Sequence, residues 1–141
     1  MKTFLKTILT LFAILLIAGL SFYFFVYNKP HVDYLKSEIE VEIQATELFS
    51  EYVSNPLAAA KKYNGKVILV SGSVNLIEQS DELVIAVMVF DDGFFGPEGV
   101  RFSLLEKQEE KIKIDKPISL KGFCTGYTGS DVILEHVSVF E

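Results

Sequence analysis

The residue types that most often do chemistry are scarce and scattered in this chain. The only histidines are His31 and His136, and the only cysteine is Cys124. Neither histidine has a cysteine or a second histidine at the spacing of a zinc site. Ser71-Gly72-Ser73 has no evident His and Asp partners, and the P-loop, Rossmann and G-x-S-x-G patterns do not occur. We therefore expect no catalytic residues, no cofactor and no enzymatic activity.

One stretch of the sequence gathers three carboxylates, Asp91, Asp92 and Glu98. Hard cations such as Ca²⁺ take oxygen ligands from flexible loops of this kind. The spacing differs from that of an EF-hand, which places Asp at alternate positions and a Glu at the end of the loop. The three residues are weak metal candidates, and a solvated acidic turn is the preferred interpretation.

The same stretch contains two adjacent aromatic residues, Phe94 and Phe95, flanked by glycines. The two rings of such a pair are not both expected to be buried in the core. Exposed apolar surface often marks a contact site. Two interpretations stay open for the Asp91–Gly99 loop: a functional contact site, or a lid made by one ring folding back over the domain.

An uncharged run from Thr7 to Asn28 dominates the N-terminus. Its 22 residues would form a helix of about 33 Å, enough to cross a bilayer core of about 30 Å. Lys2 and Lys6 precede the run and Lys29 follows it, so the positive-inside rule predicts a cytoplasmic N-terminus and an extracytoplasmic remainder, periplasmic in a Gram-negative cell.

A cleaved signal peptide is the alternative to this single-pass anchor. The apolar core of a signal peptide spans about 7–15 residues and ends in small residues. Here the run is longer and ends in the aromatic stretch Phe22–Tyr27, which suits a membrane interface. Ala18–Ser21 is a weak cleavage candidate, and lipoprotein processing would need a cysteine at the end of the run. An uncleaved membrane anchor is favoured.

The part of the chain beyond the anchor is acidic. It holds all nineteen acidic residues and ten of the thirteen basic ones, a formal charge of −9. Nucleic-acid binders normally carry a basic face, so nucleic acid is not the expected partner. A single cysteine excludes an internal disulfide, and Cys124 is expected to be a buried strand residue.

Hydrophobic periodicity divides the rest of the chain into short elements. Alternation over Ser37–Gln44 predicts an edge strand or an extended arm. Thr46 is expected to cap a helix, and Asn55-Pro56 to begin a second one that Asn64-Gly65 ends. Five strands are predicted, over Lys66–Ile77 with a bend at Gly72, Leu83–Phe90, Val100–Leu105, Pro117–Cys124 and Asp131–Phe140.

Five short strands around one core suggest a mainly β fold, a five-stranded OB-fold Greek-key barrel behind a short helical segment. The expected organisation is a cytoplasmic tip and transmembrane anchor over 1–28, a linker and possible edge strand over 29–44, and the OB-fold domain over 45–141. Other small barrels fit the strand count almost as well.

The sequence resembles the tRNA_anti-like family of bacterial OB-fold proteins, which often follow an N-terminal membrane segment. The resemblance rests on Ala45–Phe49, Ala60–Val67, Val70–Val74, Leu120–Tyr127 and Asp131–Glu135. It implies an OB-fold and supplies no catalytic motif. The Asp91–Gly99 stretch departs from the short polar turn usual at this place in the family.

Ligands of OB-folds bind on the face of strands two and three and on nearby loops. Phe94, Phe95, Arg101, Phe102 and Tyr127 are therefore the candidate ligand-binding residues, although a packed turn residue is the simpler role for Tyr127. We expect an anchored binding module for a protein or envelope component. The first alternative is an OB-fold that binds single-stranded nucleic acid or oligosaccharide, and the second is an enzyme. A structural spacer that binds no small ligand is a further alternative.

Overall fold

The computed structural model describes residues 1–27, 33–34, 36–80 and 83–141. The chain divides into two compact units, Met1–Val32 and Asp33–Glu141. Residues 29–32 and 35 of the expected linker, including Pro30 and His31, lie outside the described residues. The elements are α1 (Lys2–Tyr27), β1 (Val41–Gln44), α2 (Ala45–Ser54), α3 (Pro56–Tyr63), β2 (Val67–Ser73), β3 (Leu76–Gln79), β4 (Val84–Gly93), β5 (Gly96–Leu104), a 3₁₀ turn (Glu109–Lys111), β6 (Pro117–Tyr127) and β7 (Val132–Val139).

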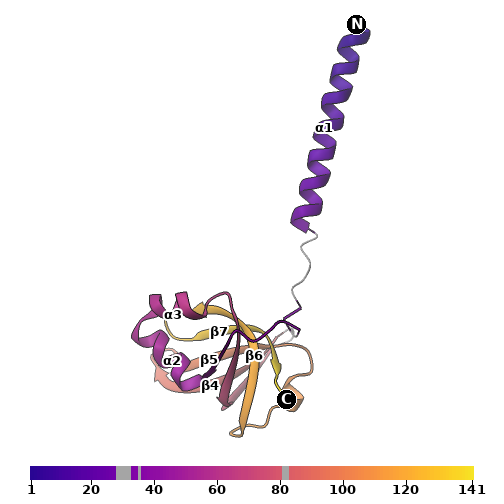
Figure 1. Ribbon diagram of the computed structural model, residues 1–141. Helices are drawn as coiled ribbons and strands as arrows, with labels where there is room; N and C mark the ends of the chain where they lie inside the picture. The colour runs from indigo at the N-terminus through magenta and orange to yellow at the C-terminus, as the bar shows by residue number, and fades with distance from the viewer. Residues whose placement is uncertain (28–32, 35, 81–82) are drawn as a thin grey trace. The chain divides into compact units, whose positions relative to one another are not determined.

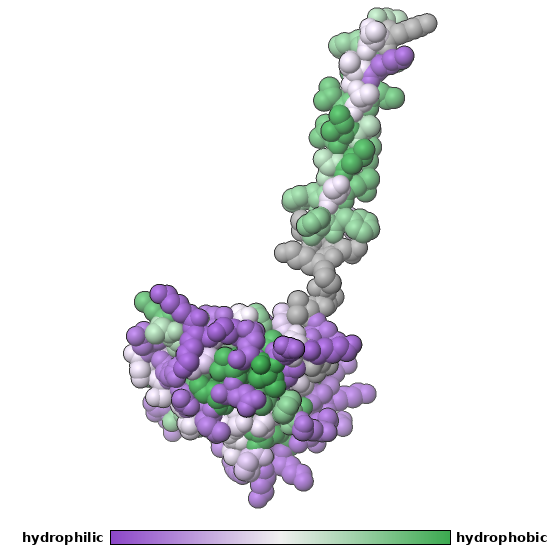
Figure 2. Space-filling model, viewed as in Figure 1, coloured by the Kyte–Doolittle hydropathy of each residue, from purple (hydrophilic) through white to green (hydrophobic). Residues whose placement is uncertain are grey.

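Helix α1 is the predicted apolar segment. Its stretch Thr3–Phe25 is long and apolar enough to cross a membrane, and apolar residues run along it on the face shown in Figure 2. The hydroxyls of Thr7 and Thr10 donate to the carbonyls of Phe4 and Thr7, at 2.8 and 2.9 Å. Such bonds satisfy polar groups within the helix, as an apolar surrounding requires.

The strands form one sheet in the order β1-β2-β6-β7-β5-β4-β3. Strands β2 and β3 follow each other in the chain, separated by Val74 and Asn75, yet β2 pairs with β6 and β3 with β4 at the other end of the order. One bent strand therefore joins both ends of a curled sheet, as in an OB barrel. The mainly β, OB-like fold is confirmed.

The strand count is higher than predicted, since the described residues form seven strands instead of five. The predicted Lys66–Ile77 strand is divided at Val74–Asn75, two residues beyond Gly72. At Gly72 itself, a Cβ atom would come within 2.6 Å of the Met88 sulfur and 3.1 Å of the Ala45 Cβ. The glycine thus permits β2 to approach both β4 and α2.

The segment before the barrel is attached to the sheet. Strand β1 is shorter than the predicted alternating stretch and pairs in parallel with β2. The ring of Tyr34 stacks on His136 (centroids 4.6 Å apart) and lies 5.0 Å from that of Phe123, and the Lys121 ammonium donates to the Ser37 carbonyl. His136, unassigned from the sequence, is thus a stacking partner of this segment.

The two short helices lie side by side at one end of the sheet (Figure 1). Asn55 caps α3 as predicted, its Oδ1 accepting from Ala58 N at 3.1 Å. The prediction for Thr46 was wrong: α2 begins at Ala45, with Gln44 at the cap position, two residues before Thr46. Leu48, Phe49 and Tyr52 of α2 enter the core.

The core contains the predicted buried cysteine. Cys124 is fully buried and lies 3.4 Å from the hydroxyl of Tyr52, which donates to Asn64 Oδ1. Burial raises the pKa of the Cys124 thiol, so the thiolate that nucleophilic chemistry requires is disfavoured.

Candidate functional site

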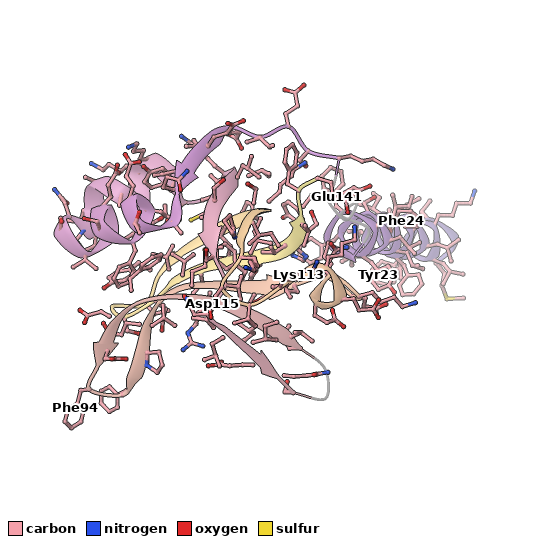
Figure 3. The ribbon with its side chains drawn as sticks, turned by 90° about the horizontal axis from the view of Figure 1, so that it is seen from below. Tyr23, Phe24, Phe94, Lys113, Asp115 and Glu141 are labelled. Atoms are coloured by element: carbon pink, nitrogen blue, oxygen red, sulfur yellow. The ribbon has the colours of Figure 1, made fainter. Side chains whose placement is uncertain are left out.

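The Asp91–Gly99 stretch is a β-hairpin and not the loop that its composition suggested. Strands β4 and β5 stay paired up to Gly93 and Gly96, which leaves Phe94 and Phe95 as a two-residue turn. Composition misled because Gly, Asp and Pro favour loops, whereas here they lie in paired strand ends. Figure 3 shows Phe94 at the tip of the hairpin, pointing away from the rest of the domain.

The two phenylalanines at this turn are almost fully exposed, Phe94 at 94% and Phe95 at 98%. Their rings contact each other edge to face, with centroids 5.0 Å apart. The fold-back lid is therefore not formed. Two-residue hairpin turns normally use Asn, Asp or Gly, so this pair serves neither the core nor the turn.

The base of the hairpin is firmly packed. A β-bulge between Val89 and Asp91 leaves Phe90 outside the register, and its ring lies 5.6 Å from that of Phe49 in α2. At Gly99 a Cβ atom would lie 2.0 Å from the Met88 carbonyl oxygen, so the two strands approach closely. Bulges commonly re-aim side chains next to functional sites, and this one lies below the aromatic tip.

The three carboxylates of the hairpin do not form a metal site in the described part of the chain, where no group of three such ligands converges. Asp91 and Glu98 are directly opposite each other on the two strands. Asp92, as the next residue of β4, points to the other face. The Glu98 carboxylate lies over Gly93, whose Cβ position would be 1.8 Å from Oε1.

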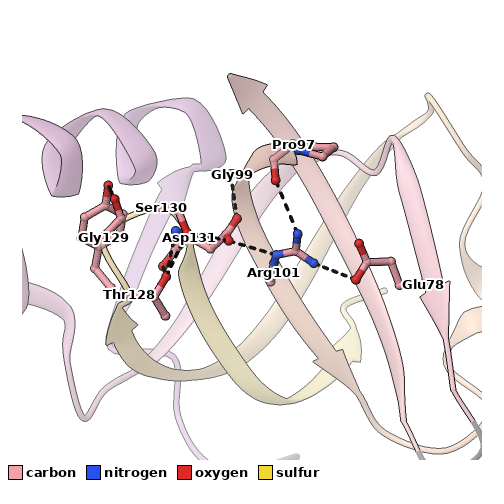
Figure 4. Close-up of polar contacts among 9 residues, drawn as sticks. Glu78, Pro97, Gly99, Arg101, Thr128, Gly129, Ser130 and Asp131 are labelled. Carbon is pink, nitrogen blue, oxygen red and sulfur yellow. Dashed lines mark hydrogen bonds and ion pairs between the residues drawn. The ribbon is translucent and has the colours of Figure 1, made fainter. Parts of the chain in front are cut away.

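Arg101 is committed to contacts within the domain (Figure 4). Its Nη1 lies 2.7 Å from Glu78 Oε2 and its Nε 3.2 Å from Asp131 Oδ2. Asp131 in turn accepts from Gly99 N at 3.0 Å through Oδ1 and from Ser130 Oγ at 3.1 Å through Oδ2. The guanidinium of Arg101, in β5, therefore links this strand of the hairpin to β3 and to the turn before β7 by ion pairs.

We predict that Arg101→Gln destabilises the domain by on the order of 1–2 kcal/mol, because it removes two charge-assisted contacts and leaves the mostly buried Asp131 without its cation. Urea unfolding of the purified chain measures this change. Adding Asp131→Asn should cost much less than in a wild-type background. Fully additive effects would show that the two side chains do not depend on each other.

Tyr127 and Phe102 lie inward, away from the exposed tip. The Tyr127 ring stacks on buried Tyr52 with centroids 5.6 Å apart, and its hydroxyl donates to the Gly129 carbonyl at 2.9 Å. Phe102 has no exposed surface, so it belongs to the core and is left out of the candidate site. The structure thus brings only Phe94, Phe95 and the carboxylates together at the hairpin end.

The Tyr127 phenol has a pKa that depends on burial and on the negative charge of Glu98 in the hairpin. Its pKa is raised, first by burial and then by the negative charges of Glu98 and Asp131. We predict that Glu98→Gln lowers this pKa toward its ordinary value near 10, as followed by NMR titration of the ring. Below pH 10 the neutral phenol stabilises the fold, and this contribution is lost as the pH rises through the raised pKa. An unchanged titration would place Glu98 away from the ring.

A hollow lies over β2, and none of the candidate residues chosen from the sequence lines it. It has a volume of about 610 Å³, within the range of small-molecule sites. Its lining has no ionisable side chain and consists of Gln44, Ser71, Gly72, Ser73, Pro117, Ile118, Ser119 and Phe140. The hydroxyls of Ser71 and Ser119 lie 2.8 Å apart. Nothing in the sequence indicated that Ser71 and Ser119 are neighbours, because only the pairing of β2 with β6 brings them together.

Comparison with known proteins agrees with this architecture. The tRNA_anti-like family model matches residues 1–139. No curated protein matches the chain. Among solved structures, a Klebsiella pneumoniae subsp. pneumoniae lipoprotein, provisionally named nucleic acid-binding, is 18% identical and superimposes with a TM-score of 0.58. The match covers 80% of this chain and all of that one, and at this identity it shows the fold alone. By the family match, the chain belongs to the tRNA_anti-like family.

Proposed function

We propose that this protein is a membrane-anchored, extracytoplasmic OB-fold binding module that engages a protein of the cell envelope through Phe94 and Phe95. The main support for this proposal is that both rings are almost completely exposed at the tip of a well-packed hairpin. Exposed aromatic residues are costly in water and are enriched among the residues that dominate protein interfaces. Since these two contribute to neither core nor turn, contact with another molecule explains their presence.

The anchor is supported by the length and apolar composition of α1 and by the lysines before it. The Klebsiella pneumoniae neighbour is called a lipoprotein, which fits an envelope location for this fold. The only cysteine of this chain is at position 124 and not at the end of the apolar run. We therefore propose that α1 anchors this protein in the membrane, as the attached lipid anchors a lipoprotein.

The topology can be tested by cysteine labelling, because native Cys124 is buried and should not react. A cysteine replacing exposed Ser54 should react with a membrane-impermeant maleimide on intact cells, whereas one replacing Thr3 should react only after lysis. The intact mass of the membrane-extracted protein should include residue 3. The reverse labelling pattern, or a mass lacking α1, would overturn the anchored topology.

Binding, and not catalysis, is the proposed activity. Within the described residues the one thiol is buried with a raised pKa, and no metal-binding group of three ligands occurs. The proposal predicts that the full-length chain, extracted in mild detergent, co-purifies with a defined envelope protein. Extraction in which no protein is enriched over an anchor-only control would contradict it.

Nucleic acid is the ligand suggested by the neighbour's provisional name. We consider it the weaker candidate, because the part beyond the anchor carries a formal charge of −9 and Arg101 is already paired with two carboxylates. Phosphate contacts require unpaired cations and produce a strong salt dependence. Oligonucleotide binding that weakens steeply with salt would restore this alternative.

An oligosaccharide is the second candidate ligand, and the hollow over β2 is the observation that favours it. Neutral hydroxyl and amide groups from Gln44, Ser71 and Ser119 lie there beside the half-exposed ring of Phe140. Neutral sugars combine hydroxyl groups with an apolar ring face that can stack on an aromatic ring. Titration with chitohexaose, followed by NMR, tests it: selective shifts at Ser71 and Ser119 would support sugar binding, and none would remove it.

A further inference from the structure

The hairpin that carries the aromatic tip is strongly one-sided in charge. Between Val84 and Leu104 there are three carboxylates and a single basic residue, Arg101. That guanidinium pairs with Glu78 and Asp131 and donates to the Pro97 carbonyl at 3.4 Å, and it forms no ion pair with the three carboxylates. The two phenylalanines therefore project from an acidic collar, defined as Asp91, Asp92 and Glu98.

Within the described part of the domain the collar has no cationic partner, although Asp91 Oδ1 accepts from the backbone N–H of Asp92 at 2.9 Å. Asp91 and Glu98 face each other across the two strands, an arrangement of like charges that destabilises an antiparallel pair. None of the three carboxylates forms an ion pair with a described lysine or arginine. A cation supplied from outside the molecule would relieve this repulsion.

Resting on the proposed function, we infer that the partner protein receives Phe94 and Phe95 in an apolar pocket whose rim carries lysine or arginine side chains. The pocket accounts for the exposed rings and the basic rim for the acidic collar. A bilayer surface is the poorer match, because anionic lipid headgroups repel carboxylates. A second copy of this domain is equally disfavoured by its charge of −9.

The experiment uses the full-length chain in its native membranes, with a photo-crosslinking amino acid at position 95. Three forms are compared: the unaltered collar, the neutral collar Asp91→Asn, Asp92→Asn, Glu98→Gln, and a matched control that neutralises exposed Glu42, Glu106 and Glu110 to Gln. The control changes the net charge equally but leaves the hairpin intact. Yields are measured at low and high salt, and the crosslinked peptide is sequenced by mass spectrometry.

The inference predicts that the neutral collar lowers the yield of the protein crosslink by about tenfold, whereas the control form is unchanged. High salt should weaken the unaltered form more than the neutral one, and the crosslinked peptide should combine apolar residues with Lys or Arg. A protein crosslink insensitive to the collar would overturn the basic rim and leave the proposed function standing. Crosslinks to lipid only, or to nothing, would overturn both.

Discussion

Replacing both Phe94 and Phe95 by Ser should abolish co-purification of the envelope partner while leaving the fold intact. Buried aromatic anchors at interfaces typically cost 2 kcal/mol or more when truncated, which is about thirtyfold in affinity for each. Both rings are exposed and contact mainly each other, so the loss of stability should stay below about 1 kcal/mol. Thermal unfolding and quantitative co-purification measure the two effects separately.

The matched control for this pair is Leu57→Ser. Leu57 is also a large apolar residue, 80% exposed, and belongs to α3 instead of the hairpin. Its replacement should alter neither stability nor co-purification. If the Leu57 variant loses the partner as completely as the phenylalanine variant does, general surface hydrophobicity would account for the association and the hairpin would have no special role.

Phe102→Ala should have the largest effect on stability. The side chain is fully buried in a core that also contains Tyr52. Truncating a buried phenylalanine typically costs about 3–5 kcal/mol of stability. For a domain of this size each kcal/mol shifts the melting temperature by about 4–8 °C. Calorimetry of the purified chain should therefore show a melting point lowered by more than about 10 °C.

This substitution also separates the two roles considered for Phe102. A packing role predicts that partner binding is lost only in proportion to unfolding, and that Phe102→Leu recovers most of the stability. A ligand-contacting role predicts weakened binding at full stability. A melting temperature unchanged in the alanine variant would show that this residue is not in the core.

The sequence predicted the parts of the fold that follow from local patterns. The apolar run gave α1, periodicity located the strands, and Asn55-Pro56 marked the start of α3. Strand alternation could also have separated Arg101 from Phe102, because neighbouring strand residues point to opposite faces. Placing both on the ligand face ignored this constraint, and the structure puts only Phe102 in the core.

The remaining features depend on contacts between distant residues. Asp131 has no mark in the sequence that pairs it with Arg101, since the register of β5 and β7 brings them together. The hollow over β2 arises in the same way from β1, β2 and β6. The Phe94-Phe95 turn was recognised by residue type, but its hairpin geometry was hidden because the turn lacks the usual turn residues.

The most direct test of the hairpin tip as a binding site compares a photo-crosslinking residue at position 95 with the same residue at position 57, each in the full-length, membrane-embedded protein. Both positions are exposed and apolar, at 98% and 80%. We expect position 95 to capture one recurrent envelope protein that position 57 does not capture. Capture of the same set of molecules at both positions, or of no protein at position 95, would contradict a binding role for the hairpin tip.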